Sequence, residues 1–284
     1  MQLLLTVLSN AAVLVPLVIG ISLVFRISGV VIFAAGQIAV FAGMLYAVVD
    51  LPLFLRFPLV LLVGMVVSVL TYAAILAAQK GGVQADAISL ATLGIAFLLE
   101  YVAIQVLGRG VFAADPWVAG SVTLLGTQVS IHRLVVIGAA LVLAVAVMLI
   151  VDRTLIGRAM EATAFDPSLA LLYGIRSQRF RLLAWAMAGI CIATVGVFQV
   201  SLASISQSSS LTMLTLGLAA AVVGGLGGLY SGIAGAIVIA AVQAIAAQYI
   251  SSELQVALVF TVLFVVLIFR PGGLFQNSRE ARRV

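Results

Sequence analysis

The chain alternates between long apolar runs and short polar connectors along its whole length. Apolar runs can be drawn at about 3–25, 27–49, 55–78, 88–107, 133–151, 182–203, 211–229, 233–250 and 254–269. The runs are continuous and do not alternate with a period of two, which predicts helices and argues against a β-barrel. A full crossing needs about 20 apolar residues, so several runs are marginal. The pattern predicts an all-α integral membrane protein, a polytopic helical bundle of 8–10 spans with broken or re-entrant helices.

The overall composition agrees with this pattern. Of the 284 residues, 64% are hydrophobic and only 8% are charged, whereas a soluble domain has about 25% charged residues. We therefore treat residues 1–284 as a single transmembrane domain. No cationic stretch precedes the first apolar run, so we expect that run to be a retained span and not a cleaved signal peptide.

Residues 152–181 form the one long polar interruption between apolar runs. Because cationic loops stay in the cytoplasm during insertion and five of the fourteen Lys and Arg residues lie here, we expect a cytoplasmic loop. The sequence predicts a short helix over 157–164 and a second one, N-capped by Asp166 and stopped by Gly174. Two capped helices at a membrane surface are typical of a docking site. The same orientation accounts for the net charge of +5 without nucleic-acid binding.

Counting spans outward from this loop gives a topology. It places Arg26, Lys80 and the arginine-rich C-terminal tail on the cytoplasmic side. The N-terminus and Ser206 then lie on the outer side.

Two apolar runs differ from plain lipid-facing helix. In 27–49, glycines recur every seven residues and Gln37 lies in the middle, which fits either a close-packing face or a broken helix lining a cavity. In 217–235, four glycines fall within five residues, which predicts close packing, a kink or a re-entrant turn.

A few polar side chains lie inside apolar runs. Glu100 costs about 2.5–3.5 kcal/mol at mid-bilayer, so it faces the bundle or a polar path, or it pairs near one interface. Gln199 and Gln243 are expected to form inter-helix hydrogen bonds, and His132 is expected at the surface. The lone Cys191 excludes a disulfide framework. No phosphate-binding glycine loop, catalytic cluster or metal-ligand cluster is recognisable, so we expect a non-catalytic protein without cofactors or metals.

The polar loop carries a recognisable pattern at Gly157, Arg158, Ala159, Ala162 (with Ala164), Asp166, Ala170, Leu172, Gly174 and Ile175. At these positions the chain resembles the permease subunits of high-affinity branched-chain amino-acid ABC importers. Three further stretches agree in order: Ala91–Gly94, Val223–Gly227 with Gly232, and Phe269–Phe275. The similarity covers most of the chain from about residue 20. One motif departs from the family. Where the family has Asn-Phe-Ala-His-Gly, this chain has Ile32, Phe33, Ala34, Ala35 and Gly36, so two polar side chains are lost.

The resemblance implies a permease subunit in a prokaryotic inner membrane. It would pair with a second homologous permease subunit, two cytoplasmic ATPase subunits and an extracytoplasmic solute-binding protein. The coupling residues would be Gly157, Arg158, Ala159, Glu161, Ala162, Asp166, Ala170, Gly174 and Ile175.

Mid-segment glycines and polar groups tolerate water better than lipid, which gives a predicted substrate path. Its residues are Phe33, Gly36, Gln37, Thr92, Glu100, Gly224 and Gly225. With Ile32 and Ala35 in the path, we expect a small amino-acid-like or hydrophobic solute. A stand-alone secondary transporter or channel is the alternative, although no paired mid-membrane charges or internal repeat support it.

Overall fold

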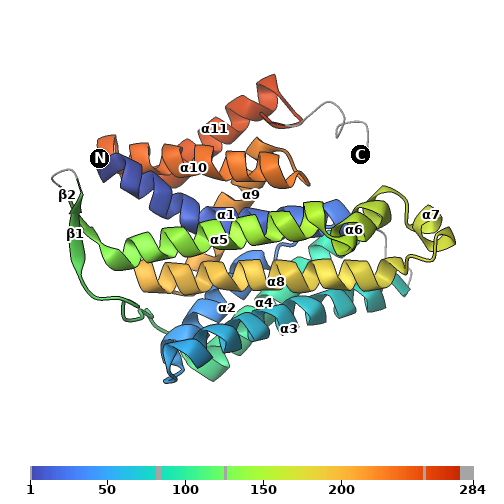
Figure 1. Ribbon diagram of the computed structural model, residues 1–284, viewed down its shortest axis with the longest axis horizontal. Helices are drawn as coiled ribbons and strands as arrows, with labels where there is room; N and C mark the ends of the chain where they lie inside the picture. Colours follow the sequence, from blue (N-terminus) through green and yellow to red (C-terminus); the bar gives the residue numbers. More distant parts are fainter. Residues whose placement is uncertain (1, 81–84, 125–126, 252–253, 276–284) are drawn as a thin grey trace.

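The computed structural model describes residues 2–80, 85–124, 127–251 and 254–275, most of which are helical (Figure 1). The helices are α1 (Gln2–Ser28), α2 (Ala35–Val48), α3 (Leu53–Lys80), α4 (Ala85–Leu107), α5 (Ile131–Arg153), α6 (Leu155–Phe165), α7 (Pro167–Leu172), α8 (Ser177–Leu202), α9 (Ser209–Gly224), α10 (Leu229–Tyr249) and α11 (Gln255–Phe269). Two strands, β1 (Ser121–Leu124) and β2 (Thr127–Ser130), form a short antiparallel hairpin.

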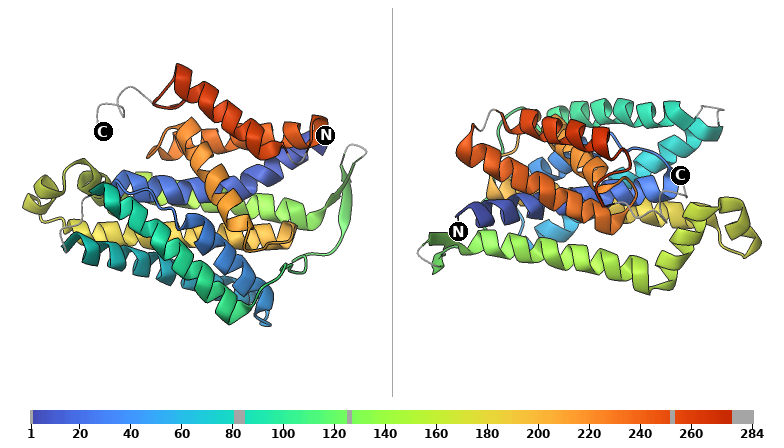
Figure 2. Two further views of the ribbon diagram at one scale, coloured as in Figure 1. Left: turned by 180° about the vertical axis from the view of Figure 1, so that it is seen from behind. Right: turned by 90° about the horizontal axis from the view of Figure 1, so that it is seen from above.

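Helix α1 is the core of the bundle. In its most apolar stretch 78% of the residues are buried, against 22% in α4. Helices α8 and α10 pack along α1, and α5 also contacts it (Figures 1 and 2). Helices α3, α4 and α5 therefore present most of their apolar surface outward, toward lipid or another subunit.

The helices agree with the predicted apolar runs. Within the described ranges, six helices (α1, α3, α4, α5, α8 and α10) are long and apolar enough to cross a membrane, and α2, α9 and α11 are shorter apolar helices. Of the two alternatives for the second run, the broken helix is present. Residues 29–34 form no helix, and α2 begins only at Ala35. That run is therefore a short non-helical segment followed by a helix of 14 residues.

The connectors divide between the two ends of the bundle. At one end, α6 and α7 lie beside the C-terminus of α1 and the N-termini of α8 and α10 (Figure 1). At the opposite end, the Gln207 side chain donates to Gly108 O at 3.0 Å, and Phe112 bridges Ile205. Arg158 and Ser206 thus lie at opposite ends, as the span count predicts. The arginines of the tail beyond residue 275 fall outside the described residues.

Small residues let the inner helices approach closely. A methyl group at Gly196 on α8 would lie 1.8 Å from Ala39 O on α2, and one at Gly43 would lie 2.7 Å from Gly196 O. Gly43 therefore lies in a close contact between α2 and α8, and Gly36 packs in the same way against α9. Gly29, the first of the series, instead ends α1 with a φ of +67°.

His132 is not at the surface, so that prediction was wrong. Its side chain is 4% exposed and packs edge-on against Trp117. Its Nδ1 accepts from the Trp117 N–H at 3.1 Å, so Nε2 carries the proton and donates to Ser201 O at 3.0 Å. The ring joins the extended segment before β1 to α5 and α8, because buried backbone groups there need partners.

Candidate functional site

The polar segment 152–181 contains the two predicted helices, α6 and α7. Helix α6 begins two residues before the predicted start, because the Thr154 side chain accepts from the Gly157 N–H at 3.3 Å and caps the helix. A methyl group at Gly157 would lie 1.9 Å from Val151 O. Only glycine therefore permits the sharp turn by which α6 leaves α5.

Helix α7 is capped at both ends, as predicted. Asp166 Oδ1 accepts from the N–H groups of Ser168 at 2.8 Å and Leu169 at 3.1 Å. These bonds, with that from the Ser168 hydroxyl as the largest contribution, hold the pKa of Asp166 below its usual value. At the other end, Gly174 has a φ of +79°, and the Ile175 N–H donates to Ala170 O at 2.9 Å. This is a Schellman motif, which fixes the end of a helix of six residues.

Helix α7 projects beyond the end of the bundle (Figure 1). Large apolar side chains are exposed on it and at its C-terminal end. Leu171, Leu172 and Tyr173 are 63%, 82% and 85% exposed. Arg158 and Arg176 lie exposed in the same segment. An apolar patch rimmed by charge is typical of a protein interface. Of the other predicted coupling residues, Ala170 is buried, and Ala159, Ala162 and Ile175 are half-buried.

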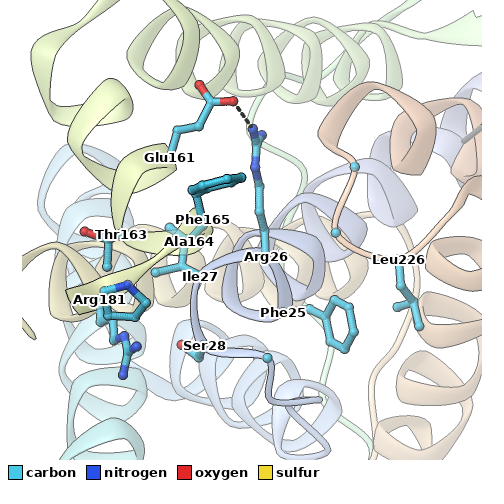
Figure 3. Close-up of a pocket in the computed structure, with 14 residues that line it drawn as sticks. Phe25, Arg26, Ile27, Ser28, Glu161, Thr163, Ala164, Phe165, Arg181 and Leu226 are labelled. Carbon is cyan, nitrogen blue, oxygen red and sulfur yellow. Dashed lines mark hydrogen bonds and ion pairs between the residues drawn. The ribbon is translucent and has the colours of Figure 1, made fainter. Parts of the chain in front are cut away.

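Glu161 on α6 turns back to the bundle. Its Oε1 lies 3.3 Å from Arg26 Nη2 near the end of α1, although the Glu161 side chain is 53% exposed (Figure 3). Arg158 is exposed as well. A cavity of about 440 Å³ adjoins this ion pair, between α1, α6, α8 and the α9–α10 turn. The pair connects the projecting segment directly to the central helix.

The break before α2 is stabilised from α4. The Thr92 hydroxyl accepts from the Phe33 N–H at 3.0 Å, and its own proton faces Ser89 O at 2.6 Å and Val31 O at 3.2 Å. Because residues 30–33 form no helical hydrogen bonds, this hydroxyl supplies a partner that lipid could not. Thr92 itself is fully buried.

In the first turn of α2, Gln37 meets Glu100. The Gln37 Nε2 donates to Glu100 Oε2 at 3.0 Å, and both side chains are half-buried. Glu100 lies seven residues before the end of α4, so it is about 10 Å inside that end. The structure thus brings together Phe33, Gln37, Thr92 and Glu100, four of the predicted path residues.

The glycines of the predicted path lie in packing contacts. A methyl group at Gly36 would lie 2.1 Å from Ser210 O on α9, and one at Gly224 would lie 2.2 Å from Ser231 O on α10. Gly225, with a φ of +116°, supports the close approach of Gly273 from the stretch after α11. Gly224 and Gly225 lie at a tight α9–α10 turn, whereas Gly36, next to Gln37 in α2, packs against the first turn of α9. Their place in a substrate path stays a prediction.

A second cavity, of about 470 Å³, lies toward the opposite end between α1, α8, α9, α10 and α11. Its polar lining is uncharged and includes Asn10, Gln199 and Gln243. Gln243 is 9% exposed, and neither glutamine side chain has a hydrogen-bond partner among the residues that the structure describes. The expected inter-helix bonds of Gln199 and Gln243 are therefore absent from this part of the chain. The sequence signals this cavity only through Thr6 and Asn10, two polar residues on α1 that lie four residues, or about one helical turn, apart.

Comparisons with known proteins agree with this architecture. The family described as branched-chain amino acid transport system, permease component, matches residues 3–267. The chain belongs to this family. It is a multi-pass protein of the prokaryotic inner membrane.

Individual relatives are distant. The chain is 26% identical over 256 residues to a probable branched-chain amino acid transport permease protein LivH of Methanocaldococcus jannaschii, covering 84% of this chain and 78% of the relative. It is 24% identical over 183 residues to the high-affinity branched-chain amino acid transport system permease protein LivH of Salmonella typhimurium, and to that of Escherichia coli. These matches cover 63% of this chain and only 59% of each of those relatives.

A solved structure shares the fold. A chain of PsaBC from Streptococcus pneumoniae, in complex with Fab, superposes with a TM-score of 0.52 over 99% of this chain and 96% of that one. At 13% identity this similarity concerns the fold alone.

Proposed function

We propose that this chain is the transmembrane permease subunit of an ATP-binding-cassette importer, driven by cytoplasmic ATPase subunits that grip α6 and α7. The observation that carries the proposal is the projecting, doubly capped α7 with Leu171, Leu172 and Tyr173 exposed. A segment outside the membrane gains nothing from apolar exposure unless a protein covers it. Two ATPase subunits, a second homologous permease and an extracytoplasmic solute-binding protein complete the proposed assembly.

The geometry of the segment suits transmission of force. A displacement of α7 by an ATPase would be transmitted to α6 through Asp166, which caps both helices. From there it reaches α5 through the tight turn at Gly157 and α1 through the pair of Glu161 with Arg26. Since α1 is the buried core of the bundle, a movement of α6 reaches the helices that would surround the solute.

The position of Glu100 on α4 supports both the proposed substrate path and a second permease subunit packed against α4. A half-buried carboxylate about 10 Å inside the end of α4 is costly against lipid. On the same helix Phe97 and Tyr101 are 63% and 61% exposed, so α4 presents an uncovered face beside the polar pair. A second permease packed there would enclose Glu100 and Gln37 in a polar path. The apolar residues at 32 and 35 favour a solute with a hydrophobic body.

Reconstitution tests the proposal. ATP-driven uptake by the full assembly in proteoliposomes should be lost when Leu172 and Tyr173 are both replaced by Asp, although the chain still inserts. Arg179→Asp, an exposed change on the neighbouring helix α8, is the matched control and should retain more uptake. Uptake by this chain alone, driven by an ion gradient without ATPases, would contradict the proposal and favour a secondary transporter.

A further inference from the structure

The cavity beside α6 has the mixed lining of a site for a small zwitterion. Its volume of about 440 Å³ is within the range of roughly 300–1,000 Å³ for small-molecule sites. The polar lining comes from Arg26, Ser28, Glu161 and Arg181 (Figure 3). Apolar walls are formed by Phe25, Ile27, Phe165 and Leu226.

One side of the cavity offers donors for a carboxylate. The Nε of Arg181 is buried and has no hydrogen-bond partner among the residues that the structure describes. Ser28 Oγ accepts from Trp185 Nε1 at 2.9 Å, which leaves the Ser28 proton for another acceptor. Burying a charged donor without an acceptor is costly, so a ligand oxygen between these two groups is favourable.

The other side of the cavity offers an acceptor for an ammonium. Glu161 Oε1 lies 3.3 Å from Arg26 Nη2, and a carboxylate accepts from more than one donor. The two side chains are 53% and 26% exposed, so a ligand can reach the pair. In Figure 3, Glu161 and Arg26 lie at one side of the lining and Arg181 and Ser28 at another, with Ile27 and Phe165 between them.

We propose that this cavity binds a neutral amino acid. Its carboxylate meets Arg181 and Ser28, its ammonium meets Glu161, and its aliphatic side chain lies against Ile27 and Phe165. The ligand then ties α6 to α1 and α8. If the proposed transport function holds, this site faces the cytoplasm. Accumulated solute would restrain the coupling segment there and slow its own import.

Binding is measured on the full chain in nanodiscs of phosphatidylcholine and phosphatidylglycerol, without transport. In a Trp117→Phe background, Trp185 is the only tryptophan, and its hydrogen bond to Ser28 makes its emission a local reporter. L-leucine should change this emission saturably, and calorimetry on the unmodified chain should give the same affinity. Leucinol and 4-methylpentanoate each lack one charged group, so each should bind about tenfold more weakly or worse.

Variants locate the site. Arg181→Gln should weaken leucine binding about tenfold or more, whereas Arg179→Gln, on the same helix but outside the cavity lining, should not. The absence of a saturable signal, or equal affinities in the two variants, overturns the proposal. An emission change that follows phosphatidylethanolamine in the nanodisc and not leucine would assign the cavity to a lipid headgroup, which also overturns it.

The regulatory consequence is tested separately. Proteoliposomes loaded with leucine on the side of α6 and α7 should import leucine more slowly than proteoliposomes without it. Arg181→Gln should remove this difference in import rate. Equal inhibition in both proteins refutes the regulation. Complete absence of ATP-driven import from empty vesicles would instead contradict the proposed function and leave the binding result standing.

Discussion

Replacing Thr92 by Val should destabilise the broken segment before α2. The two side chains have nearly the same shape, but the variant loses the hydroxyl that accepts from the Phe33 N–H at 3.0 Å. Leaving one buried backbone donor unsatisfied costs about 1–3 kcal/mol, and the carbonyls of Val31 and Ser89 lose their donor as well. A net loss of about 2 kcal/mol corresponds to a roughly 30-fold change in the folded-to-unfolded ratio.

The matched control is Thr71→Val. Thr71 is 1% exposed, as buried as Thr92, but its hydroxyl bonds only Val67 O within its own helix. Denaturant titration of the purified chain in detergent, followed by helical circular dichroism, measures both variants. We expect Thr92→Val to shift the midpoint clearly more than Thr71→Val, and Thr92→Ser to restore it. Equal shifts for the two valine variants would refute this account of the break.

Three further outcomes are expected. Gly273→Ala should lower stability by about 1–3 kcal/mol, because its methyl group would lie 2.6 Å from Gly225 N, and Gly138→Ala, with open space, should not. Folding lowers the pKa of Asp166 below the ordinary aspartate value of 3.8. The Asp166 cap should therefore stabilise α7 fully at any pH above 3.8, and this stabilisation should be lost as the pH falls through the lowered pKa. Hydrogen exchange of α7 amides, compared between the unmodified chain and Asp166→Ala, measures this dependence, and a pH-independent difference would contradict it. Single cysteines at 158 and 206, with Cys191 replaced, should label from opposite sides of the membrane.

Local rules were sufficient where the signal was local. The Asp166–Pro167 start and the Gly174 stop of α7 depend on residues within one turn of each other, and both predictions were confirmed. For the second run the sequence left a broken helix and a packing face open. The run is in fact broken at residues 29–34, before Gln37, which lies inside α2. The hairpin at 121–130 was missed, although Ser, Val, Thr and Leu alternate there with a period of two.

Pairings between distant segments were not predictable. Arg158 and Glu161 both stay predicted coupling residues. The pairing of Glu161 with Arg26, 135 residues earlier in the chain, has no signal in the sequence. For Glu100 the sequence left two alternatives open, a place on a polar path or pairing near one membrane interface. Its partner is Gln37, 63 residues away. Helical periodicity reports which residues share a face and carries no information about which helix lies opposite that face.

The burial of the helices shows the physical limit most clearly. Both α1 and α4 are long apolar runs in the sequence, yet α1 is the core and α4 is the periphery. In a soluble protein the exposed helix would carry polar residues on its outer face, but lipid is as apolar as a protein interior, so this contrast is lost. What separates the two helices is small: α4 places Phe97 and Tyr101 on its exposed face, whereas α1 places a fully buried Ser22 against Gly232 of α10. Close contacts of small residues, and not hydrophobicity, therefore indicate which helices of this chain are internal.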